Sequence, residues 1–210
     1  MSLYREPPES ITIDGILYPV DTDFRRWIEF QGILLAKEED GRKAERLCEF
    51  MISLGLPPSN NTLESMLEFY SAASQEKTGQ GKKRPQAFDF EQDSEFIFSA
   101  FLECYGIDLS TAKLHWWRFK ALFKSLPQDC EICRIMGYRT ADMKDVPKHQ
   151  KQFYREMKSR YSLGAVSAGC KTEQDMKDYV KRRYKEAQAH LSVLRSSGQS
   201  GDAGSKSTSK

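Results

Sequence analysis

Apolar residues recur at a helical period through most of this chain, and this periodicity restricts the possible folds more than any other feature. The clearest case spans residues 91–106, where one face of a helix would carry six apolar side chains: Phe96, Ile97, Ala100, Phe101, Cys104 and Tyr105. Spacings of three and four residues place side chains on one side of an α-helix, which is then buried. Gly106 predicts the end of this helix.

The same periodicity predicts helices on both sides of this segment. They span about 21–34, 42–54, 61–70, 110–126, 128–136 and 148–161, and a last helix runs from about 172 to 194. Proline and glycine mark several ends: Pro127 closes the helix at 110–126, and Gly137 predicts a turn after the helix at 128–136.

A single strand signal stands at the N-terminal end. Residues 11–18 read ITIDGILY, with Asp14-Gly15 between β-forming residues, and this pair favours a type I′ hairpin turn. Two strands alone are marginally stable, so the hairpin must pack on helices. The expected fold is therefore mainly α, a helical bundle-like globular protein with a small N-terminal β-hairpin.

Two polar segments divide the chain. Residues 75–87 lack apolar periodicity and contain two glycines, a proline and the basic run at 82–84, which predicts a flexible linker. Residues 196–210 hold almost no apolar side chain and predict a disordered tail. The expected organisation is a hairpin with helices at 1–74, the linker, a main helical module at 88–195, and the tail.

Charge is unevenly distributed, although the whole chain carries only +2. Residues 1–74 hold 7 Lys/Arg and 13 Asp/Glu, whereas residues 141–195 hold 13 Lys/Arg and 7 Asp/Glu. Such asymmetry either steers partners or reflects solvated helix faces. No secretory signal or membrane-length apolar run is visible, so we expect a protein of the cytoplasm without a membrane partner.

The cysteines and acidic residues offer candidate chemistry that the spacing does not support. Cys130 and Cys133 form one CxxC, but a structural zinc site needs a second pair or suitably spaced histidines. We therefore interpret Cys130 and Cys133 as two thiols of a short helix, at least one of them buried, rather than as a metal or redox site. The acids between Asp89 and Glu95 fit the first turn of a helix. We therefore expect no catalytic residue, metal or cofactor, and no enzyme.

His115-Trp116-Trp117 is the most unusual tripeptide of the chain. Adjacent residues of a helix point about 100° apart, so one indole can enter the core while the other is partly exposed. Exposed aromatic residues are frequent in protein interfaces. Phe98 falls off the main stripe of its helix and is a further candidate. Phe98, His115, Trp116 and Trp117 are thus candidate protein-binding residues, and the alternative is that the tryptophans are covered within this chain.

Several segments resemble the bacteriophage gp-fifteen family of siphophages. They are, in order, YPVDTDFRRWIEF (18–30), DFEQDSEFIFSAFLECYGIDL (89–109), LHWWRFKALFKSLP (114–127), IMGYRT (135–140) and KSRYSL (158–163). LHWW preceded by YGIDL is the most specific of them, and the resemblance covers about 11–163.

This resemblance implies a role in tail assembly in the host cytoplasm, most plausibly as a chaperone of the tape-measure protein through helix packing. Other tail proteins and self-association remain alternatives, as does a structural tail component. A nucleic-acid-binding accessory protein using the basic segments 144–160 and 177–185 is the competing hypothesis. The net charge of +2 makes nucleic acid the weaker partner.

Overall fold

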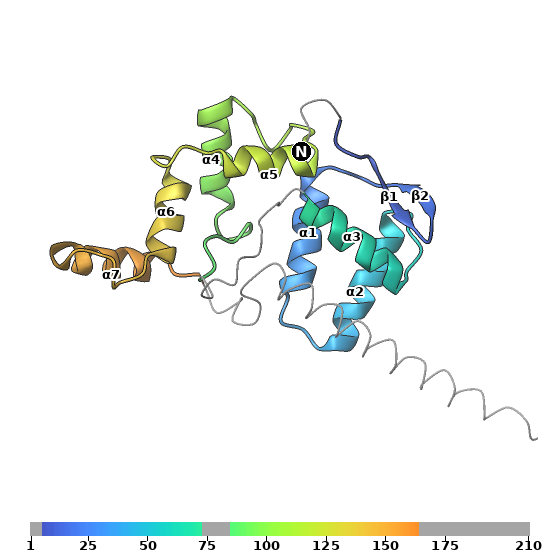
Figure 1. The fold of residues 1–210 in the computed structure, drawn as a ribbon, viewed down its shortest axis with the longest axis horizontal. Helices are drawn as coiled ribbons and strands as arrows, with labels where there is room; N and C mark the ends of the chain where they lie inside the picture. Colours follow the sequence, from blue (N-terminus) through green and yellow to red (C-terminus); the bar gives the residue numbers. More distant parts are fainter. Residues whose placement is uncertain (1–5, 73–84, 164–210) are drawn as a thin grey trace, which may run out of the picture.

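The computed structural model describes residues 6–72 and 85–163 of the chain. The predicted helix after 172, the predicted tail at 196–210 and most of the predicted linker at 75–87 lie outside these ranges. The described elements, in order, are β1 (Ser10–Ile13), β2 (Ile16–Pro19), α1 (Phe24–Leu35), α2 (Asp40–Ser53), α3 (Asn60–Ala72), α4 (Ser94–Tyr105), α5 (Trp116–Lys124), α6 (Glu131–Thr140), the 3₁₀-helix η1 (Lys148–Gln150) and α7 (Lys151–Arg160). The fold is mainly α with one small hairpin, as predicted (Figure 1).

The hairpin forms where the Asp-Gly signal predicts it. Asp14 and Gly15 have φ values of 51° and 79°, and the type I′ turn requires positive φ at both central residues. β1 and β2 are antiparallel, with Ile11 opposite Tyr18. β1 lies against α3, where the Ser65 hydroxyl donates a hydrogen bond of 2.7 Å to the Thr12 carbonyl. The hairpin is thus held by a helix, as its marginal stability requires.

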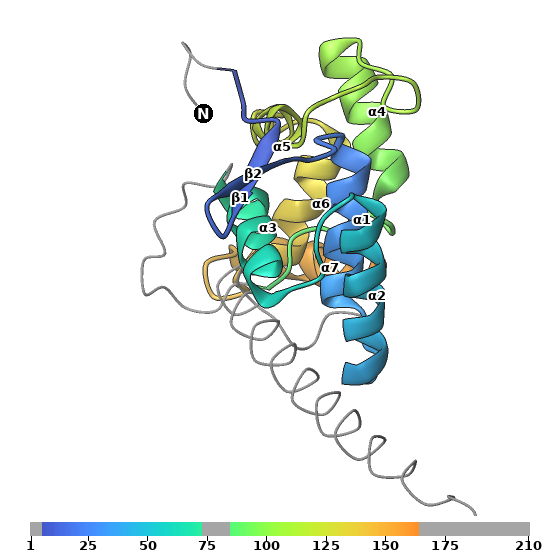
Figure 2. The same ribbon diagram turned by 90° about the vertical axis from the view of Figure 1, so that its right-hand side faces the viewer.

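Buried side chains from both sides of the predicted linker form one continuous core. The cluster runs from the hairpin through α1–α5 to the start of α6. Its largest fully buried aromatic residues are Trp27, Phe30, Phe101, Trp116 and Phe119. Phe119 of α5 stacks on Phe24 of α1 and on Phe101 of α4, with ring centroids 4.7 and 5.1 Å apart. Figure 2 shows α1 and α2 side by side, with α5 above α6.

Helix α5 begins six residues later than predicted. Residues before it pair instead with the start of α1: the Phe24 amide donates to the Leu114 carbonyl, and the Trp116 amide donates to the Thr22 carbonyl at 2.7 Å. These two bonds satisfy the backbone of residues 114–116 outside a helix, so the apolar pattern alone placed the boundary too early.

Helix α6 continues through Gly137, where a turn was predicted, and ends at Thr140. A glycine inside a helix costs about 1 kcal/mol relative to alanine. Tertiary contacts of the two residues that follow offset this cost. Tyr138 contacts the ring of Tyr154 on α7, and Arg139 forms a buried ion pair with Asp93 at the start of α4.

Helix α7 lies at the end of the long axis opposite the hairpin (Figure 1). None of its residues is fully buried, and it contacts α6 and η1. The predicted basic helix at 148–161 is therefore present, with its first three residues as the 3₁₀ turn. Within the described ranges, no helix has both the length and the apolar content needed to cross a bilayer.

Candidate functional site

His115 caps the first turn of α5 and connects it to the N-terminal segment. Its Nδ1 accepts a hydrogen bond of 3.0 Å from the Trp117 amide, and its Nε2 lies 3.0 Å from the Pro8 carbonyl oxygen. An imidazole that accepts at Nδ1 and donates at Nε2 must be neutral. Burial is the main reason that the pKa of His115 lies below its ordinary value of 6.5, while the Pro8 carbonyl opposes this shift.

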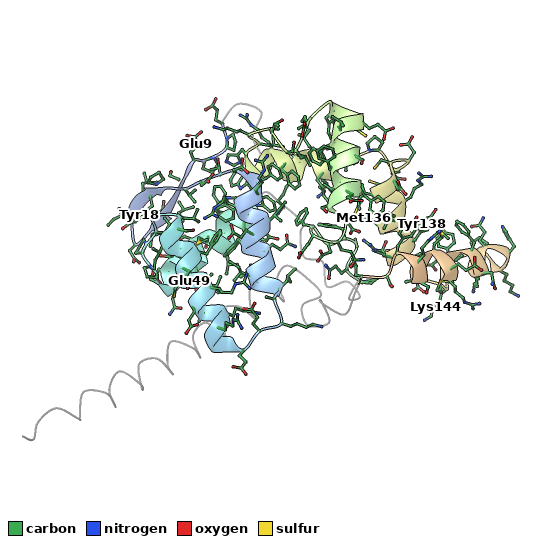
Figure 3. The ribbon with its side chains drawn as sticks, turned by 180° about the vertical axis from the view of Figure 1, so that it is seen from behind. Glu9, Tyr18, Glu49, Met136, Tyr138 and Lys144 are labelled. Carbon is green, nitrogen blue, oxygen red and sulfur yellow. The ribbon has the colours of Figure 1, made fainter. Side chains whose placement is uncertain are left out.

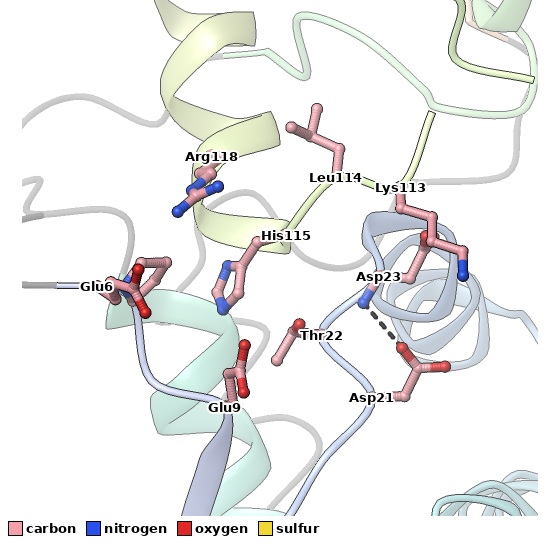
Figure 4. Close-up of a pocket in the computed structure, with 10 residues that line it drawn as sticks. Glu6, Glu9, Asp21, Thr22, Asp23, Lys113, Leu114, His115 and Arg118 are labelled. Atoms are coloured by element: carbon pink, nitrogen blue, oxygen red, sulfur yellow. Dashed lines mark hydrogen bonds between the residues drawn. The ribbon is translucent and has the colours of Figure 1, made fainter. Parts of the chain in front are cut away.

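This geometry leaves His115 a structural role. Both ring nitrogens are engaged by the backbone, so proton transfer or metal binding through either one would require breaking the cap or the bond to Pro8. The imidazole borders a cavity of about 290 Å³, lined by Glu6, Pro7, Glu9, Asp21, Thr22, Asp23, Lys113, Leu114, His115 and Arg118. Figure 4 shows His115 pointing between Glu9 and Thr22, with charges of both signs around it.

The two tryptophans hold α5 against the end of α3. Trp116 is 1% exposed, and its Nε1–H donates to the Tyr70 carbonyl at 3.1 Å. Its ring also stacks on that of Tyr70 with centroids 5.3 Å apart. Trp117 is half-buried and donates through Nε1–H to the Phe69 carbonyl at 2.9 Å. As the helical spacing predicted, one indole, that of Trp116, is in the core, and the other, that of Trp117, is only partly covered.

Phe98 lies on α4, partly buried against the core. Of the four residues predicted to bind a partner, the fold brings His115, Trp116 and Trp117 together at one junction and places Phe98 on a different helix. The buried position of Trp116 gives its side chain a packing role. Partner binding by Phe98, His115, Trp116 and Trp117 stays a prediction.

The fold brings a third cysteine towards the CxxC. Cys104, near the end of α4, interacts electrostatically with Cys130, and the thiols of Cys130 and Cys133 are hydrogen-bonded. Burial and this hydrogen bond raise the pKa of Cys133 to about 12, and burial also raises that of Cys104. Cys130 is buried, as expected of at least one thiol.

These thiols suit packing better than reaction. Metal binding and nucleophilic attack both use the thiolate, which a raised pKa disfavours. Among the residues that the structure describes, no group of three or more His, Cys, Asp or Glu side chains is placed to hold a metal ion. Nearby, the partly buried Tyr105 hydroxyl donates to the Leu122 carbonyl at 2.9 Å.

A second group of aromatic residues, which sequence reasoning did not single out as a cluster, begins at Phe96 of α4, which packs against the core, and continues through α6 and α7 to Tyr161, the residue after α7. Neighbouring rings of the group are in contact. The ring centroids of Phe96 and Tyr161 are 6.4 Å apart, as are those of Tyr161 and Tyr138. The Tyr138 centroid also lies 5.8 Å from that of Phe153 and 5.6 Å from that of Tyr154. We call these five residues the aromatic row. None of them is fully buried, and Phe153 is 47% exposed.

Basic side chains lie on α7, which carries Phe153 and Tyr154 of the aromatic row, and on the segment before it. Residues 144–160 carry 6 Lys/Arg and 2 Asp/Glu, and Lys144, Lys148, Arg155 and Arg160 are exposed. Figure 3 shows Tyr138 and Lys144 beside α7, at the opposite end of the molecule from Glu49. Tyrosine, phenylalanine and arginine are the residues that interfaces favour. The sequence predicted the basic helix at 148–161 but not the cluster of rings, because Tyr138 and Phe96 join the row through tertiary contacts.

A buried ion pair between Arg139 and Asp93 also holds Tyr161, in the middle of the row. Arg139 donates from Nη1 and Nη2 to the two carboxylate oxygens of Asp93, at 2.6 and 2.8 Å, and from Nε to the Tyr161 carbonyl. It also donates to the Ala87 carbonyl at 3.1 Å. Asp93 was interpreted from the sequence as one of several acids that favour a helix start. That interpretation missed its pairing, which joins α4, α6 and the residue after α7.

Comparison with known proteins identifies the chain at the level of a family. No curated protein and no solved structure matches it. A family model described as Bacteriophage Gp15 protein matches residues 5–163, which is well over half of the chain and includes both the α5 junction and the aromatic row. This match confirms the resemblance found in the sequence motifs. The chain therefore belongs to the Bacteriophage Gp15 protein family.

Proposed function

We propose that this phage protein acts in tail assembly as a chaperone of the tape-measure protein in the host cytoplasm. A tape-measure protein is a long helical chain whose apolar faces would aggregate if left uncovered. A mainly helical protein with partly exposed apolar side chains can cover such faces by helix packing. Family membership supports a phage function, and the partly exposed aromatic row is the single observation that best supports a protein-binding role.

Other apolar residues of the described ranges are also exposed, but they lie outside the aromatic row. Ile16 and Leu17 of the hairpin, Ile52 of α2 and Leu102 of α4 are each between 48% and 69% exposed. Scattered exposed apolar residues are normal on a protein surface. The aromatic row differs because its five rings are in contact and belong to one continuous feature.

Co-expression with tape-measure fragments tests the proposed function. We expect the full chain to keep at least one helical fragment in the soluble fraction and to co-purify with it. The Phe98→Ala variant is assayed beside the unmodified chain, because the sequence predicts that Phe98 binds a partner and the structure leaves its side chain partly exposed. If Phe98 takes part in binding, this variant should keep less of the fragment soluble. A full chain that neither solubilises nor co-purifies with fragments covering the entire tape-measure protein would refute the chaperone role.

Nucleic-acid binding is the second candidate function. The observation that favours it is that exposed Arg residues lie on the same helix as the exposed ring of Phe153. Single-stranded nucleic acids bind to sites that combine cations with aromatic stacking platforms. The net charge of +2 argues against it, since nucleic-acid-binding domains are usually strongly basic. Gel-shift titration with polyuridine and duplex DNA separates the two candidates, and salt-dependent binding of either would favour this one.

A further inference from the structure

The aromatic row has the composition of a docking site rather than of a core. Phe153 is the most exposed of its rings, and Tyr138 and Tyr154 are half-buried beside it. Tyrosine and phenylalanine bury large areas with few rotatable bonds, so they bind partners at a low entropic cost. Helix α7 contributes no fully buried residue and still presents three apolar side chains: Phe153, Tyr154 and Met157.

Side chains beneath the row keep it in a fixed position. The Arg139 guanidinium bonds both the Asp93 carboxylate and the Tyr161 carbonyl, so the end of α7 is tied to α4 and α6. The Lys158 ammonium donates to the Ala141 carbonyl at 2.9 Å and anchors α7 a second time. A preordered surface loses little conformational entropy when a partner binds.

The charges around the row specify what can cover it. Lys148, Arg155, Glu156 and Arg160 are all exposed on η1 and α7, and Glu156 keeps its negative charge although it accepts a hydrogen bond from Gln152. Over residues 144–160 the 6 Lys/Arg still outnumber the 2 Asp/Glu, so a partner that covers Phe153 meets a surface of net positive charge. An amphipathic helix with apolar anchors and flanking carboxylates satisfies the rings and the cations together, because opposite charges favour the encounter and like charges oppose it.

We propose that the aromatic row and its basic rim bind an acidic amphipathic helix of the partner protein. This inference rests on the proposed function, because it names the chemistry of the segment that a tape-measure protein would present. The apolar stripe of that helix covers Phe153 and Tyr154, and its carboxylates face Lys148 and Arg160, which lies two helical turns after Phe153 on the same face of α7. Binding weakens as the salt concentration rises, since the charged contacts lie at the exposed rim.

Two designed peptides test this proposal with the full chain. Both are three-heptad helices with leucine at positions a and d; one carries glutamate and the other lysine at positions e and g. Fluorescence anisotropy should show that the acidic peptide binds and that the basic peptide binds at least about tenfold more weakly. Phe153→Ala should weaken binding of the acidic peptide by about tenfold or more. Leu102→Ala, which removes an exposed side chain of α4 outside the row, is the matched control and should bind as the unmodified chain does.

A second variant keeps the test informative if Phe153→Ala unfolds. Arg160→Glu retains the rings, lowers affinity for the acidic peptide and reduces its salt dependence. Equal binding of the two peptides, or unchanged binding by both variants, would overturn the proposal. It would also be overturned if the row were covered by a second copy, seen as a dimer that Phe153→Ala converts to monomer, or if polyuridine competed for the same side chains.

The co-expression assay separates failure of this inference from failure of the proposed function. If the full chain and Phe153→Ala rescue a tape-measure fragment equally well, the chaperone role holds and the binding surface lies elsewhere. If the full chain rescues no fragment but binds the acidic peptide through Phe153, the surface is real and the proposed function is wrong.

Discussion

Arg139 and Asp93 form a buried ion pair that joins α6 to the start of α4. Both side chains are almost fully buried, at 5% and 1% exposure, and they are joined by two hydrogen bonds. Burying two charges is costly, so such a pair adds little to net stability compared with apolar residues of similar size. Removing one partner is different, because the other charge then remains buried without compensation.

The first prediction concerns this pair. Arg139→Met should lower the free energy of unfolding by about 3–5 kcal/mol, since it leaves the Asp93 carboxylate buried and unpaired. Urea denaturation measures the change. Arg134→Met, on the exposed side of the same helix, is the control and should change stability by less than about 0.5 kcal/mol. Adding Asp93→Leu to Arg139→Met should restore part of the loss, and a double variant weaker than either single variant would contradict this account.

His115 gives the protein a pH-dependent stability. Its pKa in the folded chain lies below the ordinary value of 6.5, so the unfolded chain binds a proton more readily than the folded one. The full contribution to stability is present above pH 6.5. It decreases as the pH falls from 6.5 towards the folded pKa, because protonation at Nδ1 removes the cap of the Trp117 amide.

The second prediction follows from this linkage. Between pH 7.5 and 5, His115→Asn should lose less stability than the unmodified chain, because asparagine can cap the helix but does not titrate. At pH 7.5 the variant should be less stable by about 1 kcal/mol, since the bond to the Pro8 carbonyl is lost. Thermal unfolding across this pH range measures both effects.

At the scale of elements, α5 acts as the connection between the first and second halves of the described chain. Its N-terminal end is joined to the start of α1 by two backbone hydrogen bonds, and both of its tryptophans donate to carbonyls at the end of α3. Phe119, one turn after Trp116 and stacked on its ring, also stacks on Phe101 of α4. The aromatic density of this helix therefore serves contacts on several sides.

The third prediction separates packing from partner binding at this helix. Trp116→Ala should cost about 3–5 kcal/mol of stability, because it opens a cavity and leaves the Tyr70 carbonyl without the indole donor. Trp117→Phe keeps most of the ring area and loses one hydrogen bond, so it should cost about 1 kcal/mol. Differential scanning calorimetry compares them. Similar melting temperatures for Trp116→Ala and the unmodified chain would show that the junction does not support the core.

Elements are also where sequence and structure differ. Local periodicity located α1 to α4 and α7, because the apolar stripe and the caps lie within a few residues of each other. It placed the start of α5 too early and the end of α6 too soon. Both errors come from tertiary contacts: backbone pairing with residues 22–24 delays the start of α5, and burial of Arg139 with Asp93 extends α6 through Gly137.

At the scale of the whole molecule, positive charge and the exposed aromatic surface lie together at the α7 end. Residues 6–72 carry 6 Lys/Arg and 13 Asp/Glu, and they form the hairpin and α1–α3. The aromatic row and its basic rim lie at α7, at the other end of the long axis (Figure 1). For the acidic helix proposed as the partner, this asymmetry predicts attraction by the α7 end and repulsion by the hairpin end, which would orient the partner before contact.

The sequence by itself determined the mainly α fold, the hairpin turn at Asp14-Gly15 and the family, because these depend on local spacing and on motifs that remain contiguous. Only the tertiary structure decided which aromatic residues serve the core and which stay accessible. Trp116 is buried because α3 ends against it, and Phe153 is exposed because α7 contacts the fold on one side alone. Asp93 and Arg139, 46 residues apart, pair only when α4 and α6 meet, and no local pattern encodes that contact.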